Sequence, residues 1–455
     1  MKTRIILSGL FALGISLSAK SQSTTSGQPT AQVQPAGWSL KDCINYGLKN
    51  YGTVRVAQYQ TQIADQQARE AIAGYLPQVN ASGNVTDNIK LQTTVLPAGI
   101  FGPEPTRVAF GQKYQTTASA SVDQVIYDKS LLVGIKAAKP NTEKAQLNAR
   151  QTQEDVVYAI ASNYYQVFVV QQQIALLKDN LKRTEQVLNI LKLQRDNGVI
   201  QPVDYTRTEV TYNSTKSQLT LAESNLKLAL NRLKFQMGMS QQQDLTLSDS
   251  TLTTKMPVVE NTGFDARNLT NFRILEANLA LQNLDRERIK AGYLPKLSAN
   301  AQYGTLALGN KYWESVQKFS GFGSIGLRVS IPLFDGFRRD AQIKQSTLNI
   351  NILQEQQRLN VASYELQFNN AQTQLQRAQI SLQNDERNIR LAQEVYEVTT
   401  LQYRQGTKPL TDLVNAETSY RQAQSDYINS LLNYNQARLD LEQSQGSLLS
   451  FYNQL

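Results

Sequence analysis

Tyr403-Arg-Gln-Gly-Thr-Lys-Pro-Leu-Thr-Asp412 separates two long helical patterns, and a second version, Arg195-Asp-Asn-Gly-Val-Ile-Gln-Pro-Val-Asp204, lies earlier in the chain. Aligning Gly198 with Gly406 sets an offset of 406 − 198 = 208 residues. Under this offset, apolar residues recur every seven positions before both stretches: Ile160, Val167, Ile174, Leu181 and Leu188 in the first copy, and Phe368, Leu375, Leu382, Ile389 and Tyr396 in the second. A seven-residue apolar spacing over several heptads is typical of a coiled coil. The sequence therefore predicts a duplicated helical hairpin with a tight turn at each stretch.

The helices around these turns have unequal lengths. A helix from about Pro140 to Gly198 would be about 87 Å long, and a shorter partner would return from Asp204 to about Gly238. In each returning helix, one set of positions seven residues apart holds small side chains: Thr215, Ala222 and Ala229 in the first, and Ala423, Ser430 and Ala437 in the second. Small residues allow close helix approach, so we expect tightly packed hairpins.

Composition limits the chemistry that the chain can perform. The 455 residues include no histidine and one cysteine, Cys43, which excludes serine–histidine catalysis, histidine-based metal sites, four-cysteine zinc sites and internal disulfides. The formal charge of +9 would suit nucleic acid, but the basic residues are scattered instead of clustered. We expect no enzyme activity, no cofactor, no metal site and no nucleic-acid partner.

The N-terminus has the pattern of a secretory signal peptide over residues 1–21. Lys2 and Arg4 precede the apolar run from Ile5 to Leu17, and small residues around Ala19 and Ser21 suit cleavage before Gln22. The alternative is a buried first helix. Residues 22–37 form a polar tail expected to be disordered, and no later stretch approaches the ~20 apolar residues of a transmembrane helix.

A second duplicated motif, Gly-Tyr-Leu-Pro, ends a helical pattern at Pro77 and again at Pro295. After each proline the apolar period changes to two, and each such strand has a partner that ends in Tyr-Asp128 or Phe-Asp335. The apolar positions of the four strands are Val79, Ala81, Gly83 and Val85; Ala118, Ala120, Val122 and Ile126; Leu297, Ala299, Ala301 and Tyr303; and Ile325, Leu327, Val329, Ile331 and Leu333.

This alternation fits either a membrane β-barrel or a half-buried soluble sheet. The signal peptide and the missing transmembrane helix favour the barrel. Four strands cannot close a barrel, because about eight is the smallest workable number, and open edges are not tolerated in lipid. The sequence thus predicts a barrel shared among chains, with the copy number left open.

These patterns divide the chain as follows: signal peptide 1–21, tail 22–37, repeat one 38–240, connector 241–263, repeat two 264–447 and C-terminal tail 448–455. Repeat one holds a β-hairpin at about 77–127 and a helical hairpin at about 130–238. Repeat two holds them at about 295–335 and 337–445.

Gly321-Phe-Gly-Ser-Ile-Gly326 matches the dinucleotide-binding fingerprint as a string, but it is followed by a strand pattern where that fingerprint requires a helix. Close packing within a strand is the favoured interpretation. The hairpin tips are better functional candidates. Gly198 and Gly406 can adopt positive φ at a helix end, and Asp204 and Asp412 can cap or begin the next helix.

The chain resembles the TolC-like outer membrane efflux proteins over essentially its whole mature length. The resemblance rests on the order and duplication of Gly-Tyr-Leu-Pro, the Tyr/Phe-Asp hairpin ends, the Gly-x5-Asp tips and the late glycines Gly238 and Gly446. It implies an α+β membrane protein that forms a homotrimer with a shared 12-stranded outer membrane β-barrel, continued by a periplasmic α-barrel of the duplicated coiled-coil hairpins. It also implies three further partners: a periplasmic adaptor (membrane fusion) protein, an inner-membrane transporter of RND or ABC type, and outer membrane lipid.

The resemblance also implies roles for the tips. The channel aperture falls on Tyr403, Lys408, Asp412 and Asn415; Asn415 replaces a further acidic residue, so the aperture carries less negative charge. Adaptor contacts fall on Asn197, Gly198, Val199 and Asp204 in the first tip, and on Gly406 and Thr407 in the second.

We therefore expect the passive exit duct of a tripartite efflux or export system in the outer membrane of a Gram-negative bacterium. The alternatives are a type I protein secretion duct and a structural periplasmic coiled-coil protein without a pore.

Overall fold

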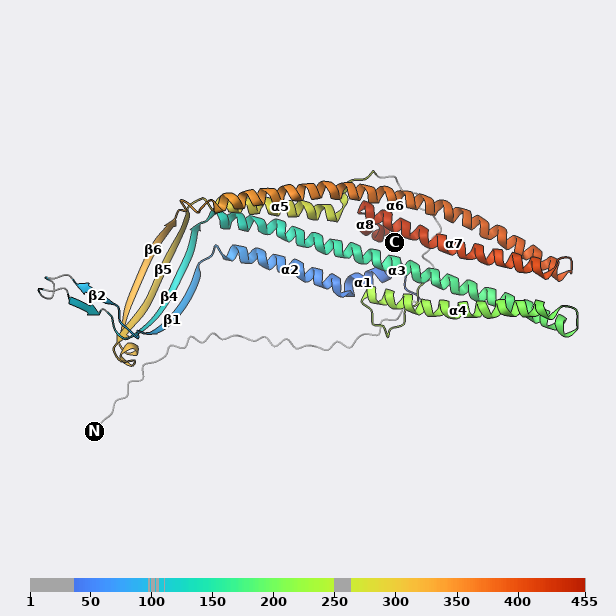
Figure 1. Ribbon diagram of the computed structural model, residues 1–455, viewed down its shortest axis with the longest axis horizontal. Helices are drawn as coiled ribbons and strands as arrows, with labels where there is room; N and C mark the ends of the chain where they lie inside the picture. The colour runs from blue at the N-terminus through green and yellow to red at the C-terminus, as the bar shows by residue number, and fades with distance from the viewer. Residues whose placement is uncertain are drawn as a thin grey trace, which may run out of the picture.

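The protein is elongated, with a β-sheet at one end and two helical hairpin tips at the other (Figure 1). The computed structural model describes residues 37–96, 99, 103, 106–109, 111–248 and 263–454. Its described elements are α1 (Leu40–Asn50), α2 (Gly52–Ala73), β1 (Gln78–Asp87), β2 (Thr93–Leu96), β3 (Thr106–Ala109), β4 (Tyr114–Tyr127), α3 (Lys129–Asp196), α4 (Pro202–Met237), α5 (Thr270–Ala291), β5 (Lys296–Gly309), β6 (Phe319–Ser330), α6 (Arg338–Arg404), α7 (Leu410–Gln445) and α8 (Leu448–Gln454), with short 3₁₀ turns at Ala266–Asn268 and Glu314–Val316.

Four antiparallel strands form the main sheet in the order β1-β4-β5-β6. One row across the sheet is apolar and consists of Val79, Val122, Ala301 and Ile325. The adjacent row is polar and consists of Asn80, Ser121, Gln302 and Ser324. Because neighbouring rows point to opposite faces, the sheet has one apolar and one polar face. The expected period of two is therefore present in space as well as in sequence.

The apolar face is open to its surroundings. Ile325 is 91% exposed, and Val79 and Leu327 are each 71% exposed. β1 and β6 are the edges of this sheet, and each pairs with a single strand among the described residues.

A bulge in β4 corrects one detail of the expected pattern. The register shifts between Val125 and Tyr127, so Tyr127, rather than Ile126, lies opposite Leu297. In a bulge, one extra residue is left out of the strand pairing. Simple alternation does not allow for this extra residue and therefore placed Ile126 in the apolar row.

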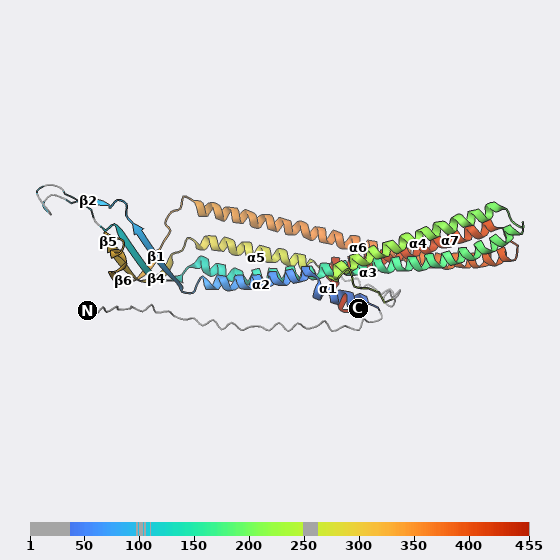
Figure 2. The ribbon, with the colours of Figure 1, turned by 90° about the horizontal axis from the view of Figure 1, so that it is seen from below.

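Long helices connect the sheet to the tips. α3 and α6 have 68 and 67 residues, so each is about 100 Å long, and each is followed by a returning helix of 36 residues. The predicted seam is confirmed where the hairpins pack, since Ile160, Val167, Phe368, Leu375 and Leu382 are buried. Near the sheet, α2, α3, α5 and α6 lie side by side in one layer (Figure 2).

Two starts were expected for the first long helix, near Pro140 and, from the bounds of the helical hairpin, near residue 130; the start near Pro140 was wrong. α3 begins at Lys129, and Pro140 lies inside it. Asp128 provides the cap: its Oδ1 accepts hydrogen bonds from the backbone N–H of Ser130 (2.8 Å) and Leu131 (3.3 Å). One missing backbone donor at Pro140 is tolerated within a helix that is otherwise held by packing along its length.

The Gly-Tyr-Leu-Pro motifs join helices to strands. α2 and α5 end at Ala73 and Ala291, directly before the two motifs. Tyr75 donates a hydrogen bond from its hydroxyl to the carbonyl of Ile126 (2.6 Å), the bulge residue of β4. In the second repeat, Tyr293 lies under the guanidinium of Arg339 at 4.7 Å, and Arg339 pairs with Asp335 at 2.6 Å.

The main core lies at mid-length, where α1, α3, α4, α7 and α8 meet (Figure 1). A capping box formed by Ser39 and Asp42 opens α1. The C-terminal segment, expected only as a tail, forms α8 and buries Leu448 and Phe451 in this core. A short two-stranded sheet of β2 and β3 in the first hairpin loop was likewise not predicted.

The predicted signal peptide, the tail up to residue 36 and most of the connector, residues 249–262, lie outside the described residues. Across the helices of the described ranges, none combines the length and apolarity needed to cross a membrane. Gly321 to Gly326 lie within β6, which agrees with a strand in place of a dinucleotide loop.

Candidate functional site at the hairpin tips

The two tips have the same backbone design. Gly198 and Gly406 each have φ of +73°. The residue after each glycine donates its backbone N–H back to the last helical turn, from Val199 to Gln194 (2.8 Å) and from Thr407 to Gln402 (3.0 Å). This left-handed helix end favours glycine, because a side chain is strained at positive φ. The sequence reasoning located both turns correctly.

Each tip then starts its returning helix with an acidic first turn. Asp204 and Asp412 lie in the first turns of α4 and α7, where a carboxylate is stabilised by the positive end of the helix dipole. Neither N-cap residue, Gln201 or Pro409, makes a side-chain capping bond. Of the two options that the sequence left open, the aspartates begin the helices and do not cap them.

The residues expected at the aperture divide into two groups. Lys408 Nζ and Asp412 Oδ2 form an ion pair of 3.1 Å within the second tip. Asn415 is exposed one turn after Asp412, on the same side of α7. Tyr403 instead faces the first hairpin, with its hydroxyl 3.5 Å from Gln194 Oε1. Burial and then the Asp204 carboxylate raise the pKa of Tyr403, so it is a neutral phenol at neutral pH.

Five of the six residues expected to contact an adaptor are exposed. Asn197, Gly198, Gly406 and Thr407 are exposed, and Val199 is 70% exposed despite being apolar. The exposed Val199 at the end of the hairpin is available for contact with a partner, whereas Asp204 is half-buried, and its charge acts on Tyr403 of the other hairpin.

Sequence reasoning missed the group that joins the two hairpins above the tips. The guanidinium of Arg183 lies 5.9 Å and 5.7 Å from the rings of Tyr396 and Tyr420, which stack on each other. Beside them, Thr184 donates a hydrogen bond to Glu417 (2.9 Å). Tyr396 was recognised only as a heptad position, and a lone arginine on a helix gives no signal in one sequence.

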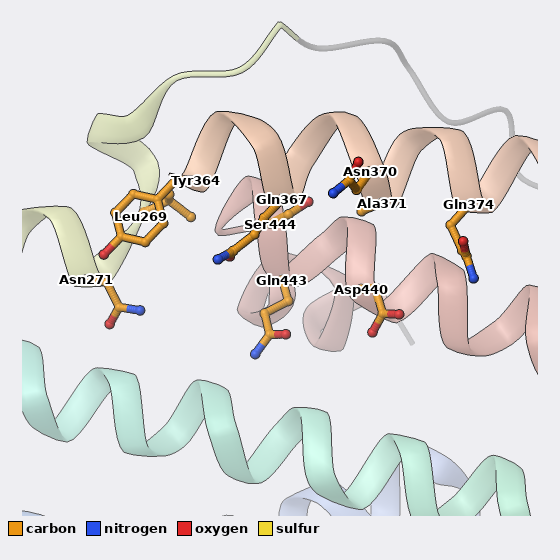
Figure 3. A pocket seen from close by; sticks show the side chains of 10 residues that line it. All are labelled: Leu269, Asn271, Tyr364, Gln367, Asn370, Ala371, Gln374, Asp440, Gln443 and Ser444. Atoms are coloured by element: carbon orange, nitrogen blue, oxygen red, sulfur yellow. The ribbon is translucent and has the colours of Figure 1, made fainter. Parts of the chain in front are cut away.

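A second polar region lies near mid-length, in a cavity of about 450 Å³ between α5, α6 and α7 (Figure 3). Asn271, Gln367, Asn370 and Gln443 line it together with one carboxylate, Asp440. Tyr158 donates a hydrogen bond to Asp440 at 2.6 Å, so this carboxylate serves to join α3 to α7. In the described part of the chain, no group of three or more carboxylate or thiol side chains is placed to hold a metal ion.

The fold and the tips together define a class: a duplicated rod whose candidate site is a pair of helix turns, with a two-faced sheet at the far end. Comparison with known proteins identifies the family. The model of the outer membrane efflux protein family matches residues 44–239 and 270–447, and the chain belongs to that family.

Individual relatives have low sequence identity to this chain, but the matches cover most of its length. Outer membrane protein TolC of Escherichia coli is 23% identical over 358 residues, which cover 73% of this chain and 70% of TolC. The toluene efflux pump outer membrane protein TtgF of Pseudomonas putida is 22% identical, with coverage of 93% and 92%. The crystal structure of the CmeC outer membrane channel of Campylobacter jejuni superimposes with a TM-score of 0.75 at 15% identity, covering 90% of this chain and 85% of CmeC.

These findings confirm the TolC-like fold, the function as an outer membrane efflux channel and the location in the outer membrane with an extension into the periplasm. The family and its structural neighbours are channels rather than enzymes. The alternative of a structural coiled-coil protein without a pore is not supported.

Proposed function

We propose that this chain forms, as a homotrimer, the passive exit duct of a tripartite efflux system. In this proposal three chains contribute 3 × 4 = 12 strands to one outer membrane β-barrel, and their helices continue it as a periplasmic α-barrel. The subunit performs no chemistry; solutes pass through a water-filled conduit.

One observation carries this proposal: the main sheet has an exposed apolar face, a polar face and two open edges. Lipid would cover the apolar face and water the polar face. Unpaired strand edges cannot remain in lipid, so β6 of one chain would pair with β1 of the next until the barrel closes. Four strands are too few to close alone.

The helices support the same assembly. α2 exposes Val56, Tyr59 and Ile63, and α6 exposes Ile352, Leu359 and Leu366 at seven-residue spacing. α2 and α6 lie at opposite ends of the helical layer (Figure 2). Pairing of these two stripes between neighbouring chains would close the layer into a tube and bury both.

We further propose that Tyr403, Lys408, Asp412 and Asn415 surround the periplasmic aperture, and that the exposed tips dock to a periplasmic adaptor. The support is the position of the tips at the end farthest from the sheet, together with their exposure (Figure 1). Through the adaptor the duct would serve an inner-membrane transporter of RND or ABC type. Small organic molecules are the substrate class suggested by the toluene efflux relative.

Adjacent residues on opposite faces of β6 test the proposal. Ile325→Lys would put a charge into lipid near the membrane centre, at a cost of about 2–4 kcal/mol, whereas Ser324→Lys would face water. We expect Ile325→Lys to reduce the amount of protein in the outer membrane fraction severalfold and Ser324→Lys to leave it near the wild-type level. Equal amounts of the two variants would contradict the proposed orientation of the sheet.

A further inference from the structure

A second cavity, of about 650 Å³, lies at the junction between the sheet and the helices. Four basic side chains line it, Arg288 from α5, Lys296 from β5, and Arg338 and Arg339 from α6, against one carboxylate, Asp285. Amide and hydroxyl groups supply most of the remaining lining, including Gln282, Gln342 and Ser130. The cavity is thus rich in hydrogen-bond donors.

Three of the four cations already have carboxylate partners. Arg288 pairs with Asp285 at 2.8 Å, Lys296 with Asp128 at 2.8 Å and Arg339 with Asp335 at 2.6 Å. Within the described ranges, Arg338 is in no ion pair. Four cations and three carboxylates leave 4 − 3 = 1 positive charge. Arg338 is the cation in no ion pair, and its charge adds to that of Arg339 in acting on the Asp335 carboxylate.

The backbone N–H groups at the start of α6 are already hydrogen-bonded and are not available to a ligand. The N–H of Arg338 is bonded to the carbonyl of Asp335, and the N–H of Arg339 to the Asp335 side chain at 3.3 Å. Asp128 is likewise engaged by two backbone N–H groups and by Lys296. A ligand in the cavity would therefore meet side-chain donors, and among the described lining residues Arg338 would be the one charged group that forms no ion pair.

The register shows on which side of the sheet this cavity lies. Lys296 lies opposite Ser330. As alternate residues of β5, Lys296, Ser298 and Asn300 point to the same, polar face of the sheet. Both Lys296 and Ser330 line the cavity. The cavity is therefore on the polar side, away from the apolar face that lipid would cover, and in the proposed duct it would face the conduit.

We propose that this cavity binds oxyanions, namely the carboxylate, sulfate or phosphate groups of anionic solutes passing through the duct, and that Arg338 forms the central ion pair. A planar guanidinium presents donors that match two oxygens of such a group. Neutral amides beside it can donate further hydrogen bonds without adding charge. The location in the conduit rests on the proposed function, whereas binding itself depends only on the chain's own residues.

The test uses the full-length protein purified in detergent and inorganic phosphate as the probe. Thermal unfolding is followed as phosphate is added at constant ionic strength, with chloride as the balancing salt. A ligand that binds the folded state raises the melting temperature in a concentration-dependent manner. We expect this rise in the wild type, a dissociation constant at least about tenfold weaker in Arg338→Gln, and partial retention in Arg338→Lys.

Arg358→Gln is the matched control, because Arg358 lies on the same helix but does not line the cavity. It should keep the wild-type response. Equal phosphate responses in Arg338→Gln and the wild type, or no response in either, would overturn the proposal.

Planar bilayer recordings separate this inference from the proposed function. Phosphate should reduce the current of wild-type channels and have a weaker effect on Arg338→Gln. If the channels conduct but are insensitive to phosphate, the anion site is rejected and the proposed function as a duct is unaffected. Protein that binds phosphate but forms no channel would reject the duct alone.

Discussion

Lys408 and Asp412 form an ion pair across one turn at the far end of the second hairpin, and both side chains are partly exposed. Such surface pairs contribute about 0–1 kcal/mol to stability, so the fold gains little from this one. Two charged side chains that neutralise each other still occupy space at the tip. If the tips surround an aperture, the main effect of the pair is on the width of that aperture.

Replacing both residues with alanine should therefore raise single-channel conductance in planar bilayers while changing the free energy of unfolding by less than about 1 kcal/mol. Asp340 and Lys344 form a pair of the same spacing at the opposite end of α6 and provide the control. Alanine at those two positions should leave conductance unchanged. Equal conductance in the Lys408/Asp412 variant and the wild type would remove this pair from the aperture.

At the scale of the element, hydrogen bonds and ion pairs hold the junctions between strands and helices. Asp128 directly follows β4, caps α3 and pairs with Lys296 of β5, so one carboxylate joins three elements. Burial alone would raise the pKa of Asp128. The hydrogen bonds from Lys296 and from the backbone of Leu131 and Ser130 outweigh burial, and the pKa is lowered.

A lowered pKa makes Asp128 stabilising at neutral pH. Its contribution is present above the unfolded-state pKa of about 3.9 and is lost as the pH falls through the folded-state value. Asp128→Asn keeps a capping oxygen and loses the charge, whereas Asp128→Ala also loses the cap, at a cost of about 1 kcal/mol.

At pH 7 we expect the wild type to have the highest melting temperature, Asp128→Asn a lower one and Asp128→Ala the lowest. The gap between the wild type and Asp128→Asn should close on acidification below about pH 4. A gap of constant size at all pH values would show that the charge of Asp128 is not the source of the difference.

For the whole molecule, the state of assembly is open to a direct test because the native thiol is inert. Cys43 is fully buried, and burial raises its pKa to about 12. Engineered cysteines on the sheet edges will therefore be the reactive thiols in the described part of the chain.

Pairing Ser82→Cys in β1 with Ser324→Cys in β6 should give covalent dimers and trimers under a short thiol cross-linker, with no larger product. Each single substitution should give no cross-linked dimers or trimers. A series that stops at the dimer, or continues past the trimer, would contradict three-chain closure.

Much of this architecture could be predicted because it repeats. Heptads predicted α3, α4, α6 and α7, and alternation after Pro77 and Pro295 predicted the four main strands. Gly198 and Gly406 predicted the tips, since positive φ selects glycine locally.

The parts that were missed depend on tertiary contacts or on stretches too short to show a period. α8 has seven residues and is held by burial of Leu448 and Phe451 in the core. Arg183 acquires its role only when Tyr396 and Tyr420, more than 200 residues away, come beside it.

The bulge at Ile126 has a consequence for how this chain can change over time. An insertion or deletion of one residue within β4 would turn every following side chain to the opposite face, and α3 would then leave the sheet from the wrong side. Within the described strands of the main sheet, an extra residue is already accommodated at Ile126 alone, where the hydroxyl of Tyr75 donates a hydrogen bond to its carbonyl. Length changes in these strands should therefore occur in pairs of residues, while the side chains themselves remain free to diverge.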